Sequence, residues 1–352
     1  MQGYEDRSKL GDEVLKNPLP CRKQPWVREH RGVTATVSPL EQLSEALRAE
    51  LGAKAVTDLA RLSGGASRET WGFRADDRPL ILQRQRKGDI RDMGVEARVV
   101  QAAFNAGVPV PELIANGSGD IGLAFMILSH IEGETIARKI LRDEQFADAR
   151  TKLVAQSAHA LAALHSIDAT TITGLPSIDQ VQQYRETLDN LNVALGQAHP
   201  TFELAFRWLE RNRPTSTRTA LVHGDFRLGN LMVGPDGLRA VLDWELAHIG
   251  DPIEDLGWLC VRAWRFGAKK PVAGLGDYDT LITEYEKASG LNVDREVVRW
   301  WEVLGTLKWG IMCMVQTSSH VLGMSRSHEL AAIGRRVCEN EYDLFVALDG
   351  KW

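Results

Sequence analysis

The spacing of apolar residues changes along the chain, and each change predicts a different kind of element. Four leucines from Leu40 to Leu51 recur at helical spacing. Ser38 and Glu41 stand three residues apart, which is the spacing of a capping box at the start of that helix. Residues 1–37 are polar and have no sustained period, so they predict an N-terminal arm outside the folded part.

The segment from about residue 57 to residue 132 predicts a small β-rich lobe with one inserted helix. Short apolar runs bounded by Gly, Pro, Asp and Asn are typical of strands. The predicted strands lie on both sides of a Gly turn within 56–75, and at 79–85, 111–117 and 123–133. Residues 95–107 have a helical period that ends at Gly107, just before Pro109 and Pro111.

After residue 133 the pattern becomes helical, with one β-rich interruption at 219–244. Helical periods are found at 151–167, 201–212, 296–316 and 329–348. Strands that come first and helices that follow predict an α+β fold. We expect three parts: an N-terminal arm (1–37), a β-rich N-lobe (38–132) and a larger, mainly helical C-lobe (133–352).

Composition excludes several classes of partner. The 352 residues carry a formal net charge of -5, so we expect no nucleic-acid surface. No apolar run is long enough to span a membrane, and the N-terminus lacks the apolar core of a secretory signal. Cys21, Cys260, Cys313 and Cys338 have no metal-ligand spacing, and we expect reduced thiols. These features favour a cytoplasmic protein with access to ATP, and they indicate no oligomeric state.

The β-rich interruption carries the residues that suggest chemistry. His223, Gly224 and Asp225 are followed four residues later by Asn230, and Asp243 comes at the end of the next strand pair. Phosphoryl transfer needs a carboxylate beside the attacking hydroxyl, and a second carboxylate and an amide oxygen that hold magnesium. We predict Asp225 as the catalytic base, and Asn230 and Asp243 as magnesium ligands. The alternative is that Asp225 and Asn230 are turn residues that bind their own backbone.

This pattern resembles a known superfamily. His-Gly-Asp, four residues, Asn, and then Leu-Asp-Trp-Glu are similar to the aminoglycoside-phosphotransferase, or protein-kinase-like, superfamily, and most closely to its branch associated with acyl-CoA dehydrogenases. The resemblance covers residues 57–320. It implies a bilobal kinase-like fold with ATP and Mg²⁺ as cofactors. It also implies that Asp251 braces the catalytic loop and that Asp255 holds the next helix.

The resemblance assigns nucleotide contacts in the N-lobe. The loop at 63–67 has the place of a phosphate-covering loop, although it is not a Walker A sequence. A glutamate on the inserted helix matches the partner of the phosphate-binding lysine, and the segment between the lobes matches the adenine-binding linker. The predicted contacts are Ser63, Gly64, Gly65, Ala66, Ser67, Gln83, Arg84, Glu96, Ser129, His130 and Ile131.

One departure concerns the phosphate-binding cation itself. The family places Lys or Arg near the end of the third strand, where this chain has Gln83 followed by Arg84. A slip of one residue moves a side chain to the other face of a strand, so only one of the two can face the nucleotide. We favour Arg84 if a β-bulge permits it. If Gln83 faces inward instead, a degenerate kinase that only binds nucleotide becomes an alternative function.

The acceptor is predicted from the C-terminal segment. Leu256–Trp352 contains twelve Lys/Arg and twelve Asp/Glu residues, and it is rich in Trp and Met. A polycationic aminoglycoside would favour an acidic site, so this balance favours a hydroxyacyl thioester or another hydroxylated metabolite. An aminoglycoside or macrolide antibiotic, choline and homoserine are the alternative small-molecule hydroxyl acceptors. We expect His223 to brace the loop, and the tryptophans to belong mainly to the core.

Overall fold

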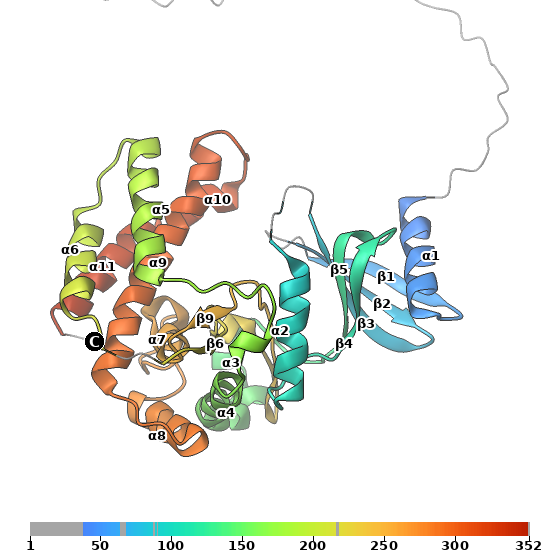
Figure 1. Ribbon diagram of the computed structural model, residues 1–352, viewed down its shortest axis with the longest axis horizontal. Coiled ribbons are helices and arrows are strands. Elements are labelled where there is room, and N and C mark those ends of the chain that lie inside the picture. The colour runs from blue at the N-terminus through green and yellow to red at the C-terminus, as the bar shows by residue number, and fades with distance from the viewer. Residues whose placement is uncertain (1–37, 64–67, 87–88, 90, 216–217, 351–352) are drawn as a thin grey trace, which may run out of the picture. The chain divides into compact units, whose positions relative to one another are not determined.

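The computed structural model describes residues 38–63, 68–86, 89, 91–215 and 218–350. The chain from Leu40 onward forms one compact unit. In this unit a five-stranded sheet precedes a mainly helical part, as Figure 1 shows. The expected α+β, protein-kinase-like class is confirmed. The domain boundaries at residues 37 and 132 stay predictions.

The sheet is antiparallel throughout, in the order β1-β2-β3-β5-β4. Its strands are β1 (Val56–Ser63), β2 (Arg68–Ala75), β3 (Arg78–Gln85), β4 (Leu113–Gly119) and β5 (Gly122–Ser129). Helices α1 (Pro39–Leu51) and α2 (Met93–Asn105) lie on opposite sides of it in Figure 1.

Strand alternation gives the sheet two different faces. On β3 and β5, Leu80, Leu82, Phe125 and Ile127 belong to the core cluster that α1 completes. Met126 points to the opposite face, where it packs against α2. Because successive side chains on a strand point to opposite faces, this alternation also decides which polar residues of β3 face the C-terminal part.

The helical part contains a long central helix, α9 (Arg295–Val321), against which α7 (Ile253–Cys260) packs. The other α-helices are α3 (Ala137–Arg142), α4 (Ala147–His165), α5 (Gln180–Leu195), α6 (Pro200–Arg211), α8 (Tyr278–Ser289), α10 (His328–Ile333) and α11 (Arg336–Leu348). The short 3-10 turns are η1 (Glu144–Phe146), η2 (Ala169–Thr171), η3 (Leu228–Asn230) and η4 (Arg262–Arg265). Among the described residues, no helix is long and apolar enough to cross a membrane.

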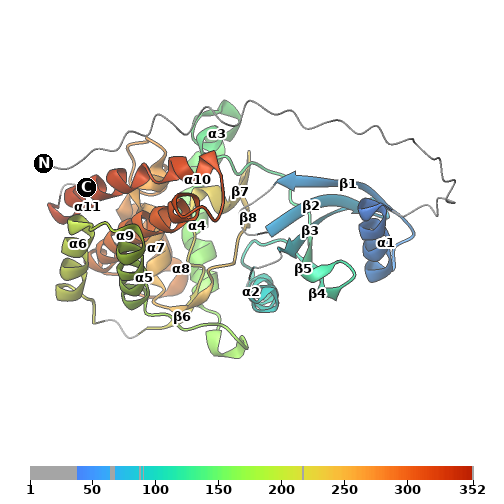
Figure 2. The same ribbon diagram turned by 90° about the horizontal axis from the view of Figure 1, so that it is seen from above.

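Two small strand pairs support the candidate site. β6 (Ala220–Val222) pairs with β9 (His248–Gly250), and β7 (Leu231–Gly234) pairs with β8 (Gly237–Val241). Glu134 and Val233 exchange backbone hydrogen bonds of 2.9 and 3.0 Å, which join the linker after β5 to β7. Figure 2 shows the β7–β8 hairpin between the sheet and the helices.

Candidate active site

The loop after β6 requires glycine at its second position. Gly224 has φ of 77°, a left-handed conformation that L-residues adopt at a cost. A Cβ added there would lie 2.5 Å from the carbonyl oxygen of Leu246. The sharp turn directs the chain from buried Val222 to Asp225 while His223 stays inside.

His223 and Asp255 hold this loop from behind. The buried His223 ring accepts from Asp225 N–H through Nδ1 at 3.1 Å, and its Nε2 lies 3.1 Å from the carbonyl oxygen of Leu242. Burial lowers the pKa of His223, which favours the neutral ring that this pattern needs. His223 therefore braces the loop, as expected.

The predicted roles of Asp251 and Asp255 are wrong in one respect, because the structure exchanges them. The Asp255 carboxylate accepts from the backbone N–H groups of His223 (2.8 Å) and Gly224 (3.0 Å), so Asp255 braces the loop. Burial alone would raise the pKa of Asp255, but hydrogen bonds from His165 and His223 hold it below its ordinary value. Asp251 accepts from Ile253 N–H at 2.9 Å and so satisfies the first backbone donor of α7.

Asp225 is buried, and its carboxylate is held by several donors. Asn230 Nδ2 donates to Oδ2 at 2.7 Å, and Trp258 Nε1 donates to Oδ1 at 2.8 Å. Arg227 Nε lies 3.1 Å from Oδ1 and 3.2 Å from Oδ2. These contacts fix the orientation of the carboxylate. Because the amide nitrogen of Asn230 is used on Asp225, its amide oxygen is the atom that could bind a metal.

Asp243 follows β8 in an unusual backbone conformation. Its φ is 66°, and such left-handed non-glycine residues are concentrated at functional sites. The N–H of the preceding Leu242 donates to the carbonyl oxygen of Asn230 at 2.8 Å, which joins the catalytic loop to the residue before Asp243. Burial, reinforced by the charges of Glu245 and Asp225, raises the pKa of Asp243 to about 7.

Asn230 and Asp243 could bind a divalent cation that has few protein ligands. Among the described residues, no group of three or more His, Cys, Asp or Glu side chains could hold a metal. Magnesium, however, is commonly held by one or two carboxylates together with substrate phosphate oxygens. Burial and the neighbouring carboxylates disfavour the ionised form of Asp243, and a dication beside Asn230 and Asp243 would favour it.

A cavity of about 330 Å³ lies between the sheet and the β7–β8 hairpin. Apolar side chains from the two sides face each other across it, and they include Ile81, Met126, Leu128, Met232 and Val241. Six of the residues predicted at the site line the cavity: Gln83, Glu96, Ser129, His130, Ile131 and Asp243. Asp225 and Asn230 are not in its lining, but they adjoin it through the Asn230–Leu242 hydrogen bond.

Among the three linker residues predicted to bind adenine, one has a backbone donor that no backbone carbonyl of the described residues uses. Ser129 N–H donates to the carbonyl oxygen of Glu112 at 2.9 Å, and His130 N–H donates to that of Pro79 at 3.2 Å. Within the described part of the chain, the N–H of Ile131 has no backbone hydrogen bond. Of the three linker residues predicted to bind adenine, Ile131 therefore offers the amide donor.

The preference for Arg84 over Gln83 is wrong. β3 pairs with β2 and β5 without any register shift, so no β-bulge turns Arg84 inward. Arg84 Nε binds Glu69 at 2.7 Å, and its Nη1 donates to the carbonyl oxygen of Ile121 at 3.1 Å. Gln83, on the opposite face of the strand, lines the cavity.

Sequence reasoning missed Arg68, which supplies a cation on the Gln83 face. Thr70 lies opposite Gln83 in the β2–β3 register, so Arg68 occupies the diagonal position on the same face. The buried Arg68 guanidinium forms a short double ion pair with Glu96, and its Nη1 lies 3.5 Å from Gln83 Oε1. The glutamate on α2 therefore does pair with a cation, but that cation comes from β2.

The remaining predicted residues belong to the loop between β1 and β2. Gly64, Gly65, Ala66 and Ser67 lie outside the described residues, and Ser63 ends β1. Their assignment to the phosphate-covering loop stays a prediction.

Comparison with known proteins decides the family. The model of the phosphotransferase enzyme family matches residues 58–301, which is more than half of the chain. The chain belongs to the phosphotransferase enzyme family. The resemblance inferred from the His-Gly-Asp motif is thereby confirmed, and the family supports the expectation of a phosphotransferase. The small-molecule hydroxyl acceptor stays a prediction.

This phosphotransferase is similar in sequence to proteins named acyl-CoA dehydrogenase family members, and in fold to solved structures of proteins named phosphotransferases. Acyl-CoA dehydrogenase family member 10 of Mus musculus is 28% identical over 318 residues, which are 84% of this chain and 30% of that protein. The chain thus spans about a third of the length of the curated relatives that it matches. A Ralstonia eutropha JMP134 protein, named as a candidate aminoglycoside phosphotransferase, has a TM-score of 0.70 at 21% identity, covering 88% of this chain and 98% of that chain.

A second solved structure is spectinomycin phosphotransferase APH(9)-Ia in complex with ADP and spectinomycin. It has a TM-score of 0.64 at 13% identity, covering 88% of this chain and 98% of that chain. At such identities the solved structures establish the kinase-like fold, and the substrate must be argued from this chain.

Proposed function

We propose that this phosphotransferase moves the γ-phosphoryl group of Mg-ATP to a hydroxyl group of a small molecule. The observation that carries the proposal is the junction between the catalytic loop and the cavity. The hydrogen bond from Leu242 to Asn230 brings Asp243, at the cavity wall, beside the loop that holds Asp225. A base, two candidate metal ligands and a space for a nucleotide therefore converge.

The adenine ring would occupy the cavity. Met126 and Leu128 on the sheet side and Val241 on the hairpin side give it two apolar walls, and a volume of about 330 Å³ lies within the range of ligand pockets. The Ile131 N–H would donate to the ring edge, because the amides of Ser129 and His130 already bind backbone carbonyls. A complex with ADP in a structural neighbour supports nucleotide use.

The phosphates would extend from the cavity toward Arg68. This guanidinium is fixed by Glu96 and lies near Gln83 and Asp243, so it would take the place of the missing cation on β3. Asn230 and Asp243 would hold Mg²⁺, which when bound would neutralise charge on the phosphates. The predicted loop at 63–67 would cover them.

Asp225 would orient the acceptor and receive its proton. The acceptor oxygen attacks the γ-phosphorus, the bond from that phosphorus to the bridging oxygen of ADP breaks, and the hydroxyl proton moves to Asp225. Asn230, Trp258 and Arg227 hold the carboxylate in one orientation. Catalysis would come mainly from positioning and charge stabilisation, since the protein forms no covalent bond to the phosphoryl group.

The acceptor that we favour is a hydroxyacyl thioester or another hydroxylated metabolite. The name acyl-CoA dehydrogenase, carried by the matched relatives, supports an acyl thioester. Aminoglycoside and macrolide antibiotics are the alternative acceptors, and solved neighbours carry those names. The degenerate kinase loses its main motivation, because Arg68 replaces the cation whose absence suggested it.

An ATP-turnover assay over a panel of hydroxylated compounds tests this function. We expect Mg²⁺-dependent turnover with at least one acceptor, and its loss on chelation. Asp225→Asn should lower turnover about 100-fold or more while nucleotide binding persists. Asp189→Asn, at an exposed position of α5, serves as the matched control. Nucleotide binding without turnover on any acceptor would favour the binding module, and full activity in Asp225→Asn would refute the base assignment.

A further inference from the structure

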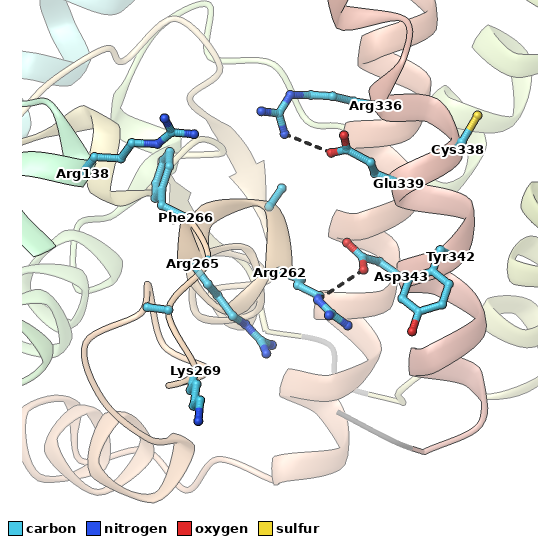
Figure 3. Close-up of a pocket in the computed structure, with 13 residues that line it drawn as sticks. Arg138, Arg262, Arg265, Phe266, Lys269, Arg336, Cys338, Glu339, Tyr342 and Asp343 are labelled. Atoms are coloured by element: carbon cyan, nitrogen blue, oxygen red, sulfur yellow. Dashed lines mark hydrogen bonds and ion pairs between the residues drawn. The ribbon is translucent and has the colours of Figure 1, made fainter.

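A second cavity, separate from the one that we assign to the nucleotide, is unusually basic. It has a volume of about 920 Å³ and lies among α3, the segment from η4 to Lys269, and α11 (Figure 3). Five cationic side chains line it, against two carboxylates. The cations are Arg138, Arg262, Arg265, Lys269 and Arg336. The whole chain is acidic, with a net charge of -5, so this concentration of positive charge is local.

The two carboxylates do not fully neutralise these cations. Asp343 lies 3.3 Å from Arg262, and Glu339 lies 3.4 Å from Arg336, both longer than the 2.7–2.9 Å of strong charged hydrogen bonds. Both arginine side chains are 45% exposed, so these pairs are weak. An incoming anion could compete for the same guanidinium groups.

Two further cations of the cavity have no ion pair among the residues that the structure describes. They are Arg138 on α3 and Lys269 in the loop after η4, and both are exposed. Arg265 differs, because it is buried and bound to Glu302 at 2.7 Å. The charge available to a ligand therefore comes from three separate elements. Several cations around one hollow raise the positive potential inside it.

The basic cavity is connected to the catalytic loop through η4. Arg262 and Arg265 of this turn line the cavity, while Trp264 between them packs against Trp258 with ring centroids 5.2 Å apart. Trp258 in turn donates to Asp225. A ligand in the cavity would thus lie against the turn whose buried side supports the catalytic carboxylate.

We infer that this cavity binds a phosphate-bearing part of the acceptor, at a distance from the hydroxyl that is phosphorylated. A guanidinium group can donate two parallel hydrogen bonds to the oxygens of one phosphate. Several cations around one hollow suit a group with more than one negative charge. Phe266 and Tyr342 add ring surface beside the cations. This inference rests on the proposed function for its link to the acceptor, but the anion site itself does not.

Pyrophosphate binding tests the site without any acceptor or nucleotide. Titration calorimetry would compare the wild-type protein with Arg138→Gln/Lys269→Gln. We expect the pocket variant to bind pyrophosphate at least fivefold more weakly. The matched control, Arg142→Gln/Lys270→Gln, removes the same charge from α3 and from the same loop, at exposed positions outside the lining, and should bind as the wild type does. Equal binding by the two double variants, or no binding by the wild type, would overturn the site.

Steady-state kinetics then test the link to the acceptor. With an accepted substrate that bears a phosphate group, the pocket variant should raise the KM for the acceptor about tenfold and leave kcat and the KM for ATP unchanged. An unchanged acceptor KM, or a panel in which only phosphate-free acceptors are used, would overturn the anchoring role. Failure of the proposed function looks different, because turnover would then be absent while pyrophosphate binding still distinguished the two double variants.

Discussion

At the scale of single residues, the proposed phosphate site depends on the position of one cation. Arg68 lies on the same face as Gln83 and pairs with Glu96, whereas Arg84 lies on the opposite face with Glu69. The Gln83 face of the sheet therefore carries a cation although β3 supplies none to it. This cation comes from β2, the neighbouring strand, and it pairs with the α2 glutamate.

Substitution of Arg68 should therefore affect catalysis much more than substitution of Arg84. We expect Arg68→Gln to raise the KM for ATP and lower kcat/KM at least tenfold, because the phosphates would lose the cation that we propose for them. Arg84→Gln is the matched control on the same sheet and should stay within about twofold. Adding Gln83→Lys to Arg68→Gln should recover part of the loss, since it returns a cation to that face. Equal kinetics for the two arginine variants would refute the role of Arg68.

The glycine of the catalytic loop permits a second prediction. Gly224→Ala combines a positive φ with a Cβ only 2.5 Å from the Leu246 carbonyl oxygen, so we expect a loss of several kcal/mol in the free energy of unfolding. Gly290→Ala is the control, because Gly290 has φ of 70° but no atom within 4 Å of an added Cβ. It should cost about 1–2 kcal/mol, the penalty of the left-handed conformation for an L-residue, which isolates the backbone cost. Urea unfolding measures both, and similar losses would show that the close contact is relieved.

At the scale of elements, a buried ionic network joins α9 and α7 to the catalytic loop. Lys308 on α9 donates to the Gly224 carbonyl oxygen at 2.9 Å and lies 3.3 Å from Glu254 on α7. Glu254 also lies 3.1 Å from His248 on β9. The loop that holds Asp225 is thus tied to two helices and a strand.

This network predicts a strong coupling between Lys308 and Glu254. Lys308→Met should destabilise the fold by about 3–5 kcal/mol, because it leaves the Glu254 carboxylate buried with one cation fewer. Lys308→Met/Glu254→Gln should be more stable than Lys308→Met, since it removes the uncompensated charge. A double-mutant cycle by urea unfolding measures the coupling. Additive losses would mean that the two side chains act independently.

The same elements show what the sequence could and could not predict. The period of 3.6 placed α2, α4, α6 and α9 to within about five residues, because apolar residues recur at helical spacing in each of these segments. Helices α5 and α8 were not identified. The sequence predicted the catalytic loop because Asp225 and Asn230 lie close together in the chain. It did not predict the place of Arg68, because that place depends on the pairing of β2 with β3 across a hairpin. The exchange of Asp251 and Asp255 had no local signal, because both flank the start of α7.

At the scale of the whole molecule, the buried ion pair between Arg265 and Glu302 should make stability depend on pH. Arg265 Nη2 lies 2.7 Å from Glu302 Oε1, and Tyr278 donates to Oε2 at 2.8 Å. Burial nevertheless raises the pKa of Glu302 to about 7, although the Arg265 charge opposes the shift. The folded protein therefore holds a proton on Glu302 at pH values where the unfolded chain has released it.

The sign of the pH dependence follows from this difference. The contribution of Glu302 to the free energy of unfolding is complete below its unfolded pKa, near 4.5, and is lost as the pH rises to about 7. The loss is on the order of 3 kcal/mol. We expect Glu302→Gln to remove this component, so that its free energy of unfolding falls less between pH 5 and pH 8 than that of the wild type.

Urea unfolding at several pH values measures the difference. Other groups titrate in both proteins and cancel in the comparison, and Glu296→Gln, an exposed position of the same helix, should retain the wild-type dependence. Parallel curves for wild type and Glu302→Gln would show that Glu302 is already ionised in the folded state, held by Arg265. Arg265 also lines the basic cavity. An ionised Glu302 would therefore lower the net positive charge that the cavity presents to a ligand.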